Sequence, residues 1–180
     1  MKTNKVIMDV VRVGAVLIGI ALAGCAGISG GGPSAVAVLE SSKGATTSGT
    51  VTFTQVGDKV RVDAEVSGLK PNAEHGFHVH EKGDCSSGDG MSTGGHFNPV
   101  GKPHGLHTTM ERHAGDLPSL QANAQGVAKM RVTMDIITVT AGLTSIVGRG
   151  LIVHRDPDDY KSQPTGNAGP RIACAVIKPR

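Results

Sequence analysis

The sequence predicts an all-β domain, a sandwich or barrel of short strands with two long functional loops. Its 180 residues suffice for one domain with its own core and an N-terminal extension. The 26 Gly and 9 Pro favour frequent turns over long helices. Segments rich in Val and Thr alternate with turns that contain Gly and Asp. The core must be aliphatic, because the chain has no Trp, one Tyr and three Phe.

The expected strands are runs of alternating or continuous apolar residues between turn residues. In chain order they cover residues 35–40, 49–55, 59–66, 73–81, 126–135, 150–154 and 172–177, with a further strand expected within residues 136–146. Gly57 and Asp58 are expected to form the hairpin turn between the second and third strands.

Two segments lack any sustained periodicity and are expected to be the long loops. Residues 82–123 are full of Gly, Pro, Ser and His and hold four of the eight histidines. Residues 155–170 form a shorter irregular stretch before the last strand. A loop of this length is uncommon in a compact domain unless it is ordered for a function.

Residues 1–24 are interpreted as a lipoprotein signal peptide. Lys2, Lys5 and Arg12 make a basic start, and the apolar stretch 13–22 is too short to span a bilayer permanently. The following Leu22-Ala23-Gly24-Cys25 resembles a bacterial lipobox, in which Cys25 becomes the lipidated first residue. The alternative is ordinary cleavage beside a chance cysteine. In the lipoprotein interpretation, residues 25–34 are the lipidated cysteine with a flexible tether, and residues 35–180 are the domain.

Export also decides how the charges and cysteines are interpreted. Without residues 1–24 the chain keeps 15 Lys and Arg against 14 Asp and Glu, which gives no reason to expect nucleic acid as a partner. With lipid on Cys25, the two remaining cysteines, Cys85 and Cys174, form an even pair in an oxidising compartment. They are interpreted as a disulfide, with two unrelated buried thiols as the alternative.

The histidines suggest a metal site. His78 and His80 share one face of a predicted strand, which gives half a site for copper or zinc, although this pair alone could be a polar strand face. His154 ends an apolar strand, and His75 falls outside the alternation and receives no role. Further candidate ligands in the long loop are His96, His104, His107, His113 and Asp116.

Four motifs resemble the copper–zinc superoxide dismutases. They are Gly76-Phe77-His78-Val79-His80-Glu81, Gly95-His96-Phe97-Asn98-Pro99, His113-Ala114-Gly115-Asp116-Leu117 and Gly166-Asn167-Ala168-Gly169-Pro170-Arg171-Ile172-Ala173-Cys174. The resemblance runs from about residue 35 to the end, and the export segment makes the chain similar to the bacterial periplasmic branch. It implies an eight-stranded Greek-key barrel and agrees with a disulfide between Cys85 and Cys174.

The resemblance also implies one copper and one zinc ion per chain. The implied copper ligands are His78, His80, His96 and His154, and the implied zinc ligands are His96, His104, His113 and Asp116. His96 would bridge the two metals. Family spacing selects His104 rather than His107, which would be an extra, exposed histidine. Asp158 matches the carboxylate that hydrogen-bonds one histidine of each set.

The implied activity is the dismutation of superoxide to oxygen and hydrogen peroxide. Arg171 would bind the anion beside the copper, His96 would carry a proton, and Thr165 would line the channel. Substrate steering by charge is expected, and the candidate residues are Lys82, Lys102 and Lys161.

Two other functions fit part of the pattern. A copper storage or delivery protein of the same fold would bind metal without turnover. A zinc hydrolase would need an open position on the zinc, which four protein ligands do not leave. The expected location is the bacterial cell envelope or periplasm, with a membrane anchor through Cys25. Both a monomer and a homodimer stay open.

Overall fold

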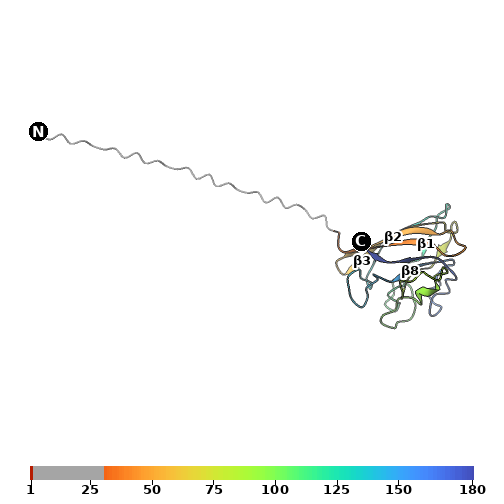
Figure 1. Ribbon diagram of the computed structural model, residues 1–180. Coiled ribbons are helices and arrows are strands. Elements are labelled where there is room, and N and C mark those ends of the chain that lie inside the picture. The colour runs from red at the N-terminus through yellow and green to blue at the C-terminus, as the bar shows by residue number, and fades with distance from the viewer. Residues whose placement is uncertain (2–30) are drawn as a thin grey trace.

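The computed structural model describes Met1 and residues 31–180 (Figure 1). The expected signal peptide and Cys25 lie outside the described residues, as does most of the tether. Among the described residues, no helix is long and apolar enough to cross a membrane. The strands are β1 (Ser34–Ser41), β2 (Ser48–Val56), β3 (Lys59–Ser67), β4 (Glu74–His75), β5 (Phe77–His80), β6 (Leu120–Gln121), β7 (Ala128–Met134), β8 (Gly150–His154), β9 (Arg171–Val176) and β10 (Lys178–Pro179), with one short 3-10 helix, η1 (Met91–Thr93).

Eight of these strands form one curled antiparallel sheet in the order β5-β8-β9-β1-β2-β3-β7, with β10 added beside β1. The first three strands follow one another as hairpins, whereas β5, β7 and β8 are reached by crossing connections. This connectivity is that of the expected Greek-key barrel. The pair β4–β6 forms a separate small sheet.

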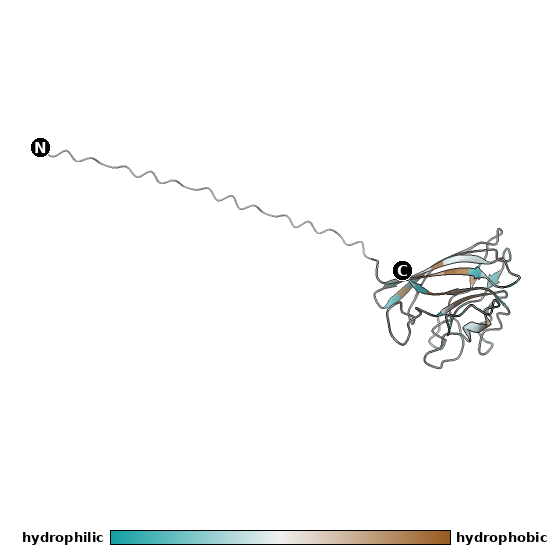
Figure 2. Cartoon of the chain, in the orientation of Figure 1, coloured by the Kyte–Doolittle hydropathy of each residue, from teal (hydrophilic) through white to brown (hydrophobic). Residues whose placement is uncertain are grey.

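The core follows the alternation of the strands. In β3, Val60, Val62, Ala64 and Val66 are buried, while the residues that alternate with them are exposed or half-buried. Phe53 and Phe77 are also fully buried, and the rest of the core is aliphatic, as predicted. Figure 2 shows hydrophobic (brown) and hydrophilic (teal) residues on the same strands.

The strand expected over residues 73–81 is divided at Gly76. Upstream of it, β4 pairs with β6, whereas downstream β5 pairs with β8, so the chain changes partner at this residue. The backbone of Gly76 donates to Asp156 O and accepts from His154 N. A Cβ at Gly76 would lie 2.7 Å from the Cβ of Ala168. The break therefore brings the second long loop against the start of β5.

The strand expected within residues 136–146 does not form. The segment folds back on itself through hydrogen bonds from Thr138 N to Thr144 O and from Ile146 N to Thr138 O. Ile137 and Ile146 are fully buried, so the apolar residues that suggested a strand anchor the two ends of a loop instead. The short strand β10, which the sequence did not predict, is the eighth member of the curled sheet.

Candidate metal centre

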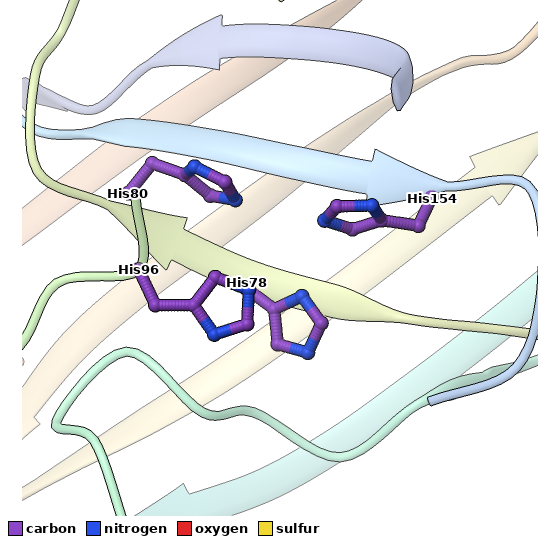
Figure 3. Close-up of side chains that lie close together, drawn as sticks. All are labelled: His78, His80, His96 and His154. Atoms are coloured by element: carbon purple, nitrogen blue, oxygen red, sulfur yellow. The ribbon is translucent and has the colours of Figure 1, made fainter. Parts of the chain in front are cut away.

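Four histidines from distant parts of the chain meet on the outer face of β5 and β8 (Figure 3). His78 and His80 lie two residues apart on β5 and point to the same side, as predicted. His154 ends the neighbouring strand β8, and His96 is brought from the long loop by an antiparallel bridge with His80. One ring nitrogen from each of the four lies within 4.8 Å of the others.

The free ring nitrogens of this group fit a metal ion. His78 Nδ1, His80 Nε2, His96 Nε2 and His154 Nε2 are buried and have no hydrogen-bond partner among the described residues. The other nitrogen of each of these four rings lies within 3.0 Å of an oxygen acceptor. His80 Nδ1 donates to Gly94 O at 3.0 Å, and His154 Nδ1 donates to Gly169 O at 3.0 Å. Such bonds leave the opposite nitrogen with a lone pair for a metal.

Burial keeps these rings neutral. It lowers the pKa of His154 to about 3. Burial, together with the neighbouring His78, lowers the pKa of His96 to about 3. Burial also holds the pKa of His80 well below its usual value. Neutral imidazole is the form of histidine that binds metals, so the environment favours a ligand role over a charged one.

A second group surrounds the carboxylate of Asp116. Its Oδ1 lies 2.9 Å from His96 Nδ1, 3.0 Å from His104 Nδ1 and 3.4 Å from His113 Nδ1. Its Oδ2 accepts the backbone N–H groups of Gly105 and His113. Burial would raise the pKa of Asp116, but the surrounding histidines outweigh burial and lower it far below its ordinary value. Three imidazoles and one carboxylate are a donor set typical of tetrahedral zinc.

His96 belongs to both groups, with Nε2 facing the first and Nδ1 facing the second. Its position depends on backbone bonds between the loop and β5. Phe97 N donates to Val79 O, and Gly115 N donates to Phe97 O. A Cβ on Gly115 would lie 2.2 Å from Val79 O, so only glycine allows this approach. The Gly-rich motifs thus place the shared histidine against the strand.

Asp158 connects the two groups from the second long loop. Its Oδ2 accepts from His78 Nε2 at 2.7 Å, and its Oδ1 accepts from His104 Nε2 at 2.9 Å. Burial opposes protonation of His104, but the bonds to Asp116 and Asp158 raise its pKa to about 9. Gly166, with φ of 65°, lies over this contact, and a Cβ there would be 1.8 Å from Asp158 Oδ1. A side chain at Gly166 would therefore displace the carboxylate.

A model of the family described as copper/zinc superoxide dismutase (SODC) matches residues 47–177. The chain belongs to this family. A solved structure described as "Crystal Structure Analysis of the clock protein EA4" is 43% identical, with a TM-score of 0.74. The match covers 81% of this chain and 93% of that chain. Since that relative is described as a clock protein, membership of the superoxide dismutase family leaves catalytic turnover to be tested.

The loop around η1 holds Arg171, to which the resemblance to superoxide dismutases assigned substrate binding. Arg171 Nη1 donates to Gly90 O at 2.7 Å and to Thr93 Oγ1 at 2.9 Å. Its Nη2 donates to Gly94 O at 2.8 Å, the same oxygen that accepts from His80. The guanidinium is half-buried, and its charge contributes to the lowered pKa values of His80 and His154. It therefore lies at the edge of the first histidine group.

The disulfide between Cys85 and Cys174 is present and joins the first long loop to β9. Arg171 lies on the same strand, three residues before Cys174. The loop that accepts hydrogen bonds from Arg171 is thus tied covalently to the strand that carries it. Arg171 and Cys174 fall within one superoxide dismutase motif, residues 166–174, and the disulfide connects this motif to the loop at Cys85.

The remaining candidates differ in their surroundings. His107 is half-buried rather than exposed, and it belongs to neither histidine group. His75, which received no role, is buried and donates from Nδ1 to His154 O at 2.9 Å. Thr165 is half-buried beside Gly166. Among the lysines, Lys82 and Lys161 are exposed, whereas Lys102 pairs with Glu111 at 2.7 Å.

Several supporting contacts were missed by sequence reasoning. The carbonyls of Gly94 and Gly169 orient two ligand rings, but every residue has a carbonyl, so no residue type signals this role. Arg149 donates to Glu81 O at 2.7 Å and lies 4.2 Å from the centre of the Phe97 ring. It thereby connects the residue after His80 to the residue after His96. An isolated arginine in a turn gives no sequence signal for such a contact.

Proposed function

We propose that the chain is a superoxide dismutase that holds one copper ion in the His78, His80, His96 and His154 group and one zinc ion in the Asp116 group. The observation that supports this most is the sharing of His96 between two buried groups with inward-facing nitrogens. Bound copper would supply reversible one-electron chemistry, which zinc lacks. One superoxide is oxidised to oxygen, while a second gains that electron and two protons to leave as hydrogen peroxide.

The residues of the chain would divide the remaining work. The Arg171 guanidinium attracts the anion and orients it at the edge of the first group. His96 Nε2 would carry one of the protons that peroxide needs. Asp116 of the second group would fix His96 in place, and Asp158 would fix His78.

The main alternative is a copper storage or delivery protein of the same fold. A solved structure similar to this chain is described as a clock protein, and one fold can serve different functions. This gives the alternative weight. The decisive measurement is superoxide consumption by protein with a measured copper and zinc content, compared with its apoprotein. Fully loaded protein that does not accelerate the reaction would support storage instead. A zinc hydrolase is disfavoured because Asp116 and its three histidines leave no open zinc position.

We expect His104→Ala to lose zinc and His107→Ala to retain it. His104 lies 3.0 Å from Asp116 Oδ1, whereas His107 belongs to neither group. Loss of a direct ligand should weaken zinc binding by at least the roughly 10–100-fold that removal of an outer partner costs. Metal analysis of both purified variants after dialysis tests the assignment. Zinc lost from the His107 variant and kept by the His104 variant would reverse it.

The proposed location is the bacterial cell envelope or periplasm, with the domain anchored to a membrane by lipid on Cys25. Superoxide is a small anion that crosses membranes poorly, so an enzyme outside the cytoplasm protects what lies outside. Anchoring would keep it at the envelope, where more than one acyl chain gives a stable attachment.

We expect Cys25→Ser to lose its acyl mass and to leave the membrane fraction, because serine has no thiol to carry the lipid. The specific activity of folded, exported protein should be unchanged. Mass spectrometry and fractionation of the producing cells provide the measurement. A variant that stays in the membrane fraction would mean that the N-terminal segment itself is the anchor, or that Cys25 is not modified.

A further inference from the structure

One end of the barrel carries an apolar surface that the metal groups do not use. It lies where the described chain begins and where the C-terminus ends (Figure 1). Gln55 N donates to Pro33 O at 2.8 Å, and Arg180 N donates to Ser34 O at 2.9 Å. Gln55 Oε1 accepts from Val139 N at 2.9 Å. These bonds join the β2–β3 hairpin, the C-terminus and the 139–147 segment around the point of chain entry.

The side chains at this end leave apolar area exposed. Val56, at the hairpin, is 52% exposed, and Leu143, in the 139–147 segment, is 68% exposed. At the same end lies a groove lined in part by Pro33, Val139, Ala141, Val147 and Pro179. We call Val56, Leu143 and this groove the entry-end surface. Exposed apolar side chains gathered at one end of a folded domain are typical of an interaction site.

Charged side chains surround the entry-end surface. Lys59, Lys178 and Arg180 are exposed there. The acidic groups at the same end are Asp58, the C-terminal carboxylate and Asp135, of which Asp135 is paired with Arg112. Basic side chains around an apolar patch suit a lipid surface, because their charged ends reach headgroup phosphates while the apolar residues contact the acyl boundary.

The length of chain before the described residues places a membrane close to this surface. Cys25 precedes Gly31 by six residues in the sequence. At no more than about 3.6 Å per residue, this segment spans at most about 22 Å. A lipid on Cys25 would therefore keep the entry-end surface within that distance of the bilayer.

Arg171 and His154 lie at the opposite end of their strands from the entry-end surface. In the β8–β9 pair, Gly150 lies opposite Val176 near the entry end, whereas His154 lies opposite Arg171 at the far end. Pro179, which pairs with Ala35 at the start of β1, follows Arg171 by eight residues. At about 3.3 Å per residue, the two ends are roughly 25 Å apart.

We propose that the entry-end surface rests on the headgroup region of the membrane that anchors Cys25, so that Arg171 and His154 lie at the end of the barrel away from the lipid. This orientation rests on the proposed lipid anchor. It would leave the substrate path open to bulk solution and clear of the negative surface potential of the bilayer, which repels an anion.

The test uses tryptophan fluorescence, because the natural chain has no Trp. The protein is the metal-loaded chain from Cys25 onwards, which contains every strand and the whole described core. With Cys85 and Cys174 joined, Cys25 offers the single thiol for coupling to maleimide lipid in phosphatidylcholine–phosphatidylglycerol vesicles. The test variant is Leu143→Trp. The matched control is Ala124→Trp, in the exposed turn before β7 at the opposite end.

We expect the Leu143→Trp emission to shift to the blue and to be quenched by brominated acyl chains, while the Ala124→Trp emission keeps its position and intensity. Equal quenching of both variants, or of neither, would overturn the orientation. A blue shift of Leu143→Trp that appears without vesicles as protein concentration rises would overturn it in favour of contact with a second copy of the chain. Because chemical coupling replaces the natural lipid, these outcomes do not depend on the Cys25→Ser result.

Discussion

Protein loaded with zinc alone is expected to consume superoxide no faster than the apoprotein, and added copper should restore the activity. Dismutation requires a group that accepts an electron and returns it, and zinc has no accessible second oxidation state. The four inward nitrogens of His78, His80, His96 and His154 form the group suited to a redox-active ion. Protein loaded with copper alone should keep activity, since Asp116 and its neighbours support His96 from outside the reacting centre.

His80→Ala separates the two sites within one chain. His80 belongs only to the first group, so its loss should remove copper and activity while zinc stays bound. His107→Ala is the matched control, because His107 is a half-buried histidine outside both groups. The measurement is metal content beside superoxide consumption on the same preparations. Full activity in zinc-only protein, or in His80→Ala without copper, would contradict the proposed chemistry.

Local pattern was sufficient to predict most of the barrel. The alternation in β3 and the turn at Gly57 and Asp58 are read from neighbouring residues, and the strand expected over 150–154 coincides with β8. The failures involve partners distant in sequence. Gly76 divides a predicted strand because the chain changes from β6 to β8 there. Ile137 and Ile146 have the apolar character of strand residues, but both are anchors of a folded-back loop.

The candidate site was accessible from sequence for a different reason. Its chemistry lies in residue types, histidine and aspartate, whose spacing within and between four motifs matches a known family. Asp158 was found in this way, and the structure places it between His78 and His104. The acceptors at Gly94 and Gly169 are backbone carbonyls, and the burial that keeps His154 neutral arises only from the assembled fold. Neither property has a local sequence signal.

We expect Arg171→Ala to lower kcat/KM for superoxide by roughly 10- to 100-fold, since a hydrogen bond to a charged group contributes about 1.5–3 kcal/mol. The guanidinium lies beside His80 and His154 and keeps its positive charge at physiological pH. Arg171→Lys should retain an intermediate rate, because it keeps the charge and loses the planar arrangement of donors. Raising the ionic strength should slow the natural protein more than Arg171→Ala, as screening weakens attraction of the anion.

A purely structural role for Arg171 makes a different prediction. Arg171 and His80 share the carbonyl of Gly94, so loss of the guanidinium could disturb the ring that faces the copper position. In that case Arg171→Ala would lose copper or change the copper absorption spectrum, and the lysine variant would do the same. A substrate role requires that both metals and the spectrum stay unchanged while the rate falls.

Arg155→Ala is the matched control, because Arg155 is an exposed arginine of the neighbouring loop that pairs with Asp156. If it lowered the rate and its salt dependence as much as Arg171→Ala, the effect would be one of general charge rather than of a directed contact with the substrate.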